Sequence, residues 1–178
     1  MRKSIIASIA AFCFFSLACI TANAQKETKK FSVGIGFEGG LPVGTANEGY
    51  HFTAGGTIRL SYHVGPGFVT LTSGLSAWLP KTGEGDATKA SLVIPVKAGY
   101  KYIVHKPFFV MGELGYSSFK VYYKDYNGDL ANNTSGGFTF APTVGANFGV
   151  FEVGIKYEST SLKGGSASNV ALRLGLNF

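Results

Sequence analysis

Three histidines are the first side chains to consider, because an imidazole beside a serine can activate its hydroxyl for ester hydrolysis. His63 follows Ser61 by two positions in an alternating segment, so the pair shares one face of an extended strand. His51 and His105 have no such neighbour, and the sequence contains no His-x-Ser motif. We therefore predict no catalytic residue, and we interpret His63 as a polar residue of a strand face.

The segment "DYNGD", Asp125–Asp129, resembles the start of a calcium-binding loop. An EF-hand loop needs glycine at its sixth position and a bidentate glutamate at its twelfth. Here Gly128 comes too early, and Gly136 occupies the twelfth position. The sequence thus favours a solvated loop, and it predicts neither a metal site nor a cofactor.

Charged residues recur at alternate positions among small polar ones, on one face of several extended segments. Five are basic and four acidic, so they can form ion pairs if that face is enclosed, where buried charges must be paired. Exposure to lipid would instead cost about 2–4 kcal/mol for each mid-membrane Lys or Arg. The predicted interior network comprises Glu38, Arg59, Lys97, Lys101, Glu113, Glu152, Lys156, Glu158 and Arg173.

The elements that carry these charges are predicted from a period of two, since alternate residues of a strand share a face. Opposite the charges and the Gly, Ser and Thr residues lies an apolar face in each segment. Pro95 and Pro142 fall inside the pattern, where proline is tolerated at bulges, and two bulges are predicted. The eight segments span 31–39, 52–64, 68–79, 91–102, 108–122, 138–148, 151–159 and 171–178.

The first segment is interpreted as an export leader rather than as part of the fold. It has a basic start, an apolar stretch and Ala22-Asn23-Ala24 before Gln25, the pattern of a cleaved signal peptide over 1–24. Lipidation at Cys19 stays an alternative. Both cysteines lie in the leader, and without it 14 basic residues face 10 acidic ones, a net charge of +4. The basic residues are scattered, so no nucleic-acid partner is predicted.

The connections indicate how the eight strands are joined after a short segment at 25–30. Long connections at 43–51, 80–90, 123–137 and 159–168 alternate with short ones near 65–67, 104–107 and 149. Short turns at one end and long loops at the other characterise an up-and-down transmembrane barrel. We therefore predict an all-β fold over 31–178, an eight-stranded antiparallel up-and-down transmembrane β-barrel.

A soluble barrel would have the same periodicity with its apolar face inside. Two observations favour the membrane form. The polar face is mostly Gly, Ser and Thr, which suit the crowded interior of an eight-stranded barrel. The aromatic residues concentrate near both ends of the strands, as in interfacial girdles. Examples are Phe108, Phe148 and Phe151 at the short-turn end and Trp78, Tyr116, Phe138 and Tyr157 at the long-loop end.

The C-terminal "LRLGLNF", with Leu172, Leu174, Leu176 and Phe178 alternating, resembles the assembly signal of bacterial outer-membrane proteins. Residues 31–178 resemble the outer-membrane β-barrel domain family, of the porin-family-like type common in Bacteroidetes and similar to OmpA/OmpX-type barrels. The resemblance implies insertion by the barrel-assembly machinery and an integral outer-membrane location with lipid as partner. It defines architecture and carries no shared catalytic motif.

Function is predicted at the loop end of this barrel. We expect a structural or surface-interaction protein without catalysis, whose outward lysines could contact lipopolysaccharide phosphates. Those lysines are Lys81, Lys89, Lys120, Lys124 and Lys163. Two alternatives remain at this point: a small-solute, porin-like pore, and a lipid A-modifying enzyme that would depend on His51.

Overall fold

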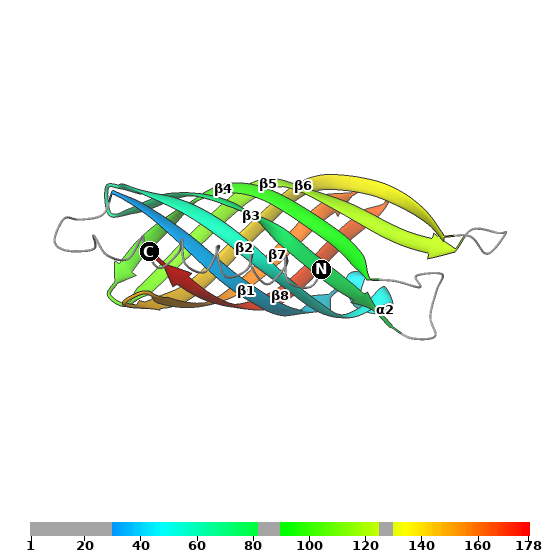
Figure 1. Cartoon of the computed structure of the whole chain (residues 1–178), viewed down its shortest axis with the longest axis horizontal. Helices are drawn as coiled ribbons and strands as arrows, with labels where there is room; N and C mark the ends of the chain where they lie inside the picture. The colour runs from blue at the N-terminus through cyan, green and yellow to red at the C-terminus, as the bar shows by residue number, and fades with distance from the viewer. Residues whose placement is uncertain (1–29, 82–89, 125–129) are drawn as a thin grey trace, which may run out of the picture. The chain divides into compact units, whose positions relative to one another are not determined.

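In the computed structural model, eight antiparallel strands close into a barrel (Figure 1). The structure describes residues 30–81, 90–124 and 130–178. Each strand pairs with the next along the chain, and β8 pairs with β1, so the predicted fold class is confirmed. The strands are β1 (Phe31–Val43), β2 (Tyr50–Val64), β3 (Gly67–Pro80), β4 (Ser91–His105), β5 (Phe108–Lys124), β6 (Leu130–Phe148), β7 (Phe151–Leu162) and β8 (Gly165–Asn177).

Closure of the ring explains the alternating pattern at the end of the chain. β8 pairs with β1 over ten positions, from Gly34 opposite Asn177 to Val43 opposite Ser168. Its apolar residues Leu172 and Leu174 point outward and are 48% and 49% exposed, whereas Arg173 between them is fully buried. Pairing on both sides removes the free edges that an isolated terminal strand would have.

The two faces of the sheet follow the predicted alternation. Large apolar side chains such as Phe37, Ile58 and Phe151 are exposed on the outside, while the charged residues of the same strands are buried inside. This is the reverse of a soluble barrel, in which the outer face is polar. Within the described part of the chain, no helix is long and apolar enough to cross a membrane.

Glycines shape three of the tight connections. Gly65, Gly149 and Gly164 have φ of +58°, +64° and +98°, a left-handed backbone that other residues adopt at a cost. The first two lie in the β2–β3 and β6–β7 turns, at the end of the barrel that we call the turn end. Gly164 lies at the opposite end, which we call the loop end, together with the short helix α2 (Ala46–Gly49).

The strands reach further toward the loop end than their apolar pattern predicted. The expected loop at 159–168 is wrong, because β7 continues to Leu162 and β8 begins at Gly165. The expected loop at 123–137 is also wrong over most of its length, because β6 begins at Leu130. Residues 82–89 of the expected loop at 80–90, and residues 125–129 of the expected loop at 123–137, lie outside the described residues.

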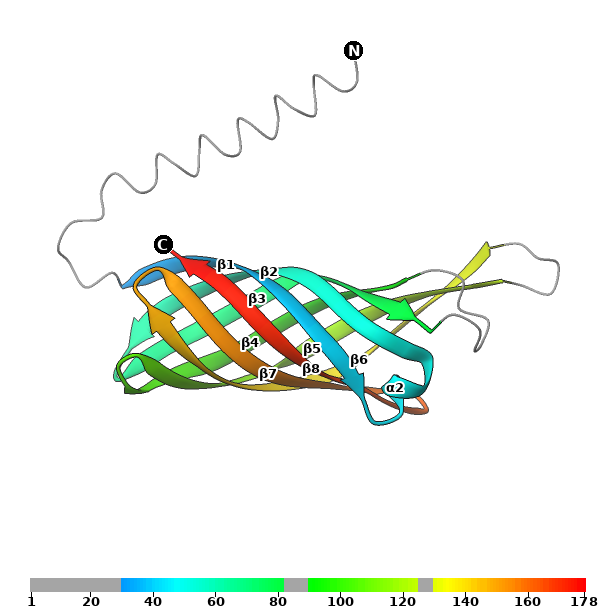
Figure 2. The same cartoon turned by 90° about the horizontal axis from the view of Figure 1, so that it is seen from below.

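The β5–β6 hairpin extends beyond the pairing of its neighbours (Figure 2). β5 and β6 pair as far as Lys124 opposite Leu130, whereas β4 pairs with β5 only up to Lys120. On the other side, β7 pairs with β6 only from Thr139 toward the turn end. The outer part of the hairpin is therefore a two-stranded ribbon above the closed barrel.

The two prolines interrupt pairing without forming the predicted bulges. Pro95 keeps its register opposite Ser117 of β5, but neither it nor Ile94 has a partner in β3. Pro142 likewise pairs with Gly112 of β5 and has no partner in β7. Because proline lacks an N–H, one side of each strand loses a backbone bond while its alternation is kept.

Candidate functional site

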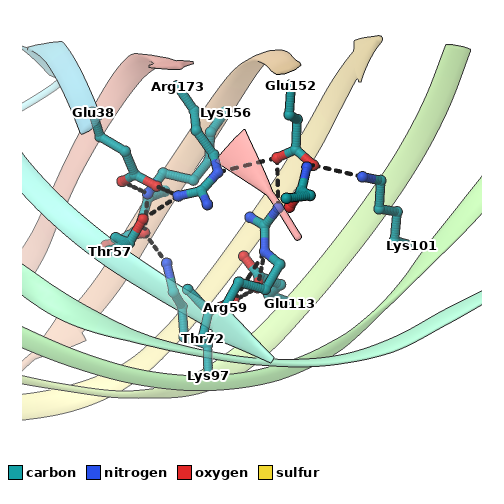
Figure 3. A network of polar contacts seen from close by, with 12 residues as sticks. Glu38, Thr57, Arg59, Thr72, Lys97, Lys101, Glu113, Glu152, Lys156 and Arg173 are labelled. Atoms are coloured by element: carbon teal, nitrogen blue, oxygen red, sulfur yellow. Dashed lines mark hydrogen bonds and ion pairs between the residues drawn. The ribbon is translucent and has the colours of Figure 1, made fainter. Parts of the chain in front are cut away.

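The barrel interior contains a network of charged side chains (Figure 3). All nine residues of the predicted network point into it, from β1, β2, β4, β5, β7 and β8. Seven of them are at most 6% exposed, and the side chains of Glu38 and Glu158 are 12% exposed. Alternation along each strand brings these residues to a common interior even though they are distant in sequence.

Glu152 on β7 is the centre of one half of the network. Its Oε1 accepts from Arg59 Nη1 at 2.6 Å and from Arg173 Nε at 3.1 Å. Its Oε2 accepts from Lys101 Nζ at 2.5 Å. One carboxylate therefore compensates three cations, which come from β2, β4 and β8.

Two glutamates organise the other half. Glu38 accepts from Lys156 and, at 3.2 Å, from Arg173 Nη1. Glu158 forms ion pairs with Lys97 and, at 2.9 Å, with Lys156. Arg173 thus joins both halves, because its guanidinium reaches Glu38 and Glu152 together.

The remaining acid, Glu113, joins the network through a hydroxyl. Thr72 Oγ1 donates to Glu113 Oε1 at 2.5 Å, and Arg59 Nε lies 3.8 Å from the same oxygen. Five cations and four carboxylates leave this set with a formal charge of +1. Each of the nine has an opposite charge within 4 Å, so the arrangement holds charges in place and leaves no activated nucleophile.

An apolar layer closes the lumen above the network, toward the loop end. Trp78, Val93 and Phe119 are 2–5% exposed, and the indole packs edge-on against Tyr50 and Phe119 with centroids 5.6 Å apart in each pair. The placement of Trp78 in the outer aromatic girdle is therefore wrong. Trp78 is an even-numbered residue of β3, like Thr70 and Thr72, which belong to the polar face that was predicted to lie inside. This alternation was the signal that could have placed Trp78 in the lumen.

A second apolar layer lies on the turn-end side of the network. Phe109 and Met111 of β5 are 2% and 4% exposed, and Lys101 Nζ lies 4.0 Å from the centre of the Phe109 ring. A methyl group on Gly145 would lie 2.6 Å from Phe109 Cζ, so the ring needs glycine beside it. Neither Phe109 nor Met111 was predicted as an interior residue, although both alternate in phase with Glu113 along β5.

Glycine also makes room for the arginine that joins the two halves. A methyl group on Gly36 would lie 2.5 Å from Arg173 Cζ. The guanidinium therefore lies directly against the backbone of β1, and a side chain at position 36 would have to displace it from its ion pairs with Glu38 and Glu152.

The histidines do not form a site. His51 is exposed, and its Nδ1 lies 3.2 Å from the Pro80 carbonyl oxygen. His63 packs edge-on against Phe68 at 5.1 Å, and His105 is exposed beside the β4–β5 turn. Among the described residues, no group of three or more His, Cys, Asp or Glu could hold a metal ion. The segment "DYNGD" lies outside those residues.

The fold resembles three small barrels of solved structure. These are the attachment invasion locus protein Ail of Yersinia pestis (16% identity, TM-score 0.61), the N-terminal barrel domain of Pseudomonas aeruginosa OprF (13%, 0.62) and Neisserial surface protein A (13%, 0.51). The alignments cover 83%, 83% and 86% of this chain and 97%, 97% and 100% of theirs. At these identities the likeness shows the fold alone. No curated protein sequence matches the chain.

The family model described as "Outer membrane protein beta-barrel domain" matches residues 10–178. That span includes all eight strands. The chain therefore belongs to the outer membrane protein β-barrel domain family and is an integral barrel of the outer membrane.

Proposed function

We propose that this protein is a non-catalytic barrel with a structural and surface-interaction role, and that its loop end faces outward. The observation that carries the proposal is a filled lumen combined with a hairpin that extends beyond the ring. Short turns face the periplasm in bacterial barrels of this kind, which directs the β5–β6 hairpin to the cell exterior.

The filled lumen argues against the alternative of a porin-like pore. A solute would have to displace the layer of Trp78 and Phe119, the ion pairs of Arg173 and Glu152, and the Phe109 layer. Eight strands leave an interior just wide enough for side chains. We expect purified protein to give no conductance steps in planar lipid bilayers, and steady steps from folded protein would refute this part of the proposal.

The loop end offers groups that recognise anionic sugars. Lys163 is exposed in the β7–β8 turn, Lys120 is exposed on β5, and Lys81 follows β3. A structure of Ail in complex with the heparin analogue sucrose octasulfate is among the similar folds. We infer that the phosphate or sulfate groups of surface glycans are the ligand class of this end.

A truncation of the hairpin tests the surface role. Residues 121–133 are replaced by Asn-Gly, which joins Lys120 to Thr134, two residues that already face each other in the ladder. Intact cells that carry this variant, or Lys163→Gln, are expected to bind less labelled heparin oligosaccharide than wild type. Lys106→Gln, at an exposed lysine of the turn end, is the matched control. Equal binding by all four proteins would contradict the proposal.

The export leader is part of the same proposal. Cleavage after Ala24 predicts a mature chain that begins at Gln25, and lipidation would instead leave Cys19 as the first residue. The intact mass of the protein from isolated outer membranes distinguishes the two.

A further inference from the structure

The lipid-facing side of the barrel has a large apolar hollow near the closure of the ring. Its volume is about 940 Å³, and it crosses five neighbouring strands, β7, β8, β1, β2 and β3. β8 and β1, which close the ring, lie side by side in Figures 1 and 2. A smaller hollow of about 580 Å³ lies mainly over β5, β6 and β7 and shares only Val153 with the larger one.

The hollow results from small residues surrounded by tall ones. Gly56 points outward between Phe37 of β1 and Leu75 of β3, which are its direct neighbours in the ladders. Ser73 occupies the corresponding place opposite Ile58. The side chains of Phe37, Ile58 and Leu75 are 51–58% exposed and extend outward beyond the backbone. They form the sides of the hollow, and the small residues between them form its floor.

The floor reaches the strand backbone because the residues beneath it are also small. Gly36, Gly74 and Gly175 point inward and line the hollow through their backbone atoms. Gly36 and Gly175 lie close to the guanidinium of Arg173 on the lumen side. The wall is therefore thin at this place, with an ordered interior behind it.

We propose that this hollow binds one acyl chain of a phospholipid from the inner leaflet of the outer membrane. The hollow continues the lipid-facing surface of an integral membrane barrel, and the outward residues around it are apolar apart from Ser73. Five strands span about 19 Å along the hydrogen-bonding direction, which suits an elongated chain.

Its position indicates the leaflet. Phe151 is the first residue of β7 after a turn-end connection, and Leu176 is the penultimate residue of β8, whereas Ser73 and Leu75 lie midway along β3. The hollow therefore extends from the turn end to the middle of the barrel. In the asymmetric outer membrane, phospholipid occupies the periplasmic leaflet. Lys30 is exposed just before β1, at the turn end, where its ammonium group could pair with a phosphate headgroup.

The test fills the hollow without altering the interior. A Cβ on Gly56 meets only the Gly36 carbonyl oxygen, at 3.9 Å, so Gly56→Leu has space outward. Gly112 on β5 has nothing within 4 Å of an added Cβ and lines neither hollow, so Gly112→Leu is the matched control. Heat-modifiable migration on a detergent gel verifies folding of each variant, and Ser73→Leu serves if Gly56→Leu does not fold.

Native mass spectrometry of barrels extracted in mild detergent is the readout. We expect wild type and Gly112→Leu to retain one phospholipid, and Gly56→Leu to reduce the lipid-bound fraction about tenfold, as expected when about two methylene groups lose contact. Three results would each overturn the proposal: no retained lipid on wild type, equal retention by the filled variant, or lipid A as the retained species.

Discussion

Replacing Glu152 by glutamine removes the charge on which three buried cations depend. The substitution keeps the shape of the side chain, so packing changes little. Arg59, Lys101 and Arg173 then share an uncharged amide, and the formal charge of the nine-residue network increases from +1 to +2.

The expected cost is large because the charges cannot reach water. Breaking one buried ion pair by removing a single partner costs about 3–5 kcal/mol. Glu152 has three partners, but Arg173 keeps its contact with Glu38, and Arg59 keeps its longer one with Glu113. We therefore expect Glu152→Gln to lower the free energy of unfolding by about 4 kcal/mol, a large part of the ~5–15 kcal/mol of a typical domain.

Urea unfolding of the barrel in lipid vesicles measures this free energy. Fluorescence of Trp78, the single tryptophan of the chain, reports loss of the loop-end apolar layer, and gel migration reports loss of the barrel. The pair Lys101→Met with Glu152→Gln restores the formal charge to +1 and should recover part of the loss. Glu48→Gln, at an exposed residue of α2, is the control and should change stability by less than about 0.5 kcal/mol. A change below about 1 kcal/mol for Glu152→Gln would refute the reasoning, because it would mean that water compensates these cations.

Three further changes test other parts of the structure. Gly36→Ala places a methyl group against the guanidinium of Arg173 and should lower the free energy of unfolding in urea by about 1–3 kcal/mol. Gly112→Ala should leave that free energy nearly unchanged. Trp78→Ala should lower the free energy of unfolding by about 3–5 kcal/mol, with gel migration as the measure of unfolding. An unchanged free energy would show that the loop-end layer does not stabilise the fold. Phe178→Ala should reduce the amount of barrel in isolated outer membranes while the urea midpoint of the inserted fraction stays unchanged; an equal amount would contradict its predicted role in assembly.

The faces of the strands could be predicted because one rule determines them. Because alternate residues of a strand share a face, one residue of known orientation, such as Arg173, determines which face each other residue of its strand occupies. The nine charged residues were therefore assigned to the interior together. Their pairings could not be predicted, because Glu152 and Arg59 are 93 positions apart and meet only when the ring closes.

The strand ends were harder to predict than the strand faces. "NNTSGG" in β6 carries no apolar alternation, because the outer hairpin has no core on which to pack an apolar face. Strand pairing there depends on backbone bonds to β5, and these leave no signature in hydrophobicity. Trp78 was misplaced for a related reason: an aromatic residue near a strand end fits both a girdle and a lumen layer, and only parity separates the two.

Because of the two prolines, the ion pair of Lys97 and Glu158 has a structural role beyond charge compensation. Backbone pairing is interrupted at two positions between β3 and β4 beside Pro95, and at two positions between β6 and β7 beside Pro142. These interruptions divide the closed ring into two groups of strands that we call panels, β4 to β6 and β7 to β3. Lys97 lies two residues from the first proline, and Glu158 lies in the second unpaired stretch. Their ion pair crosses the interior from one panel to the other. The charged interior thus connects the two panels across the lumen, beside the positions where their backbone pairing is interrupted.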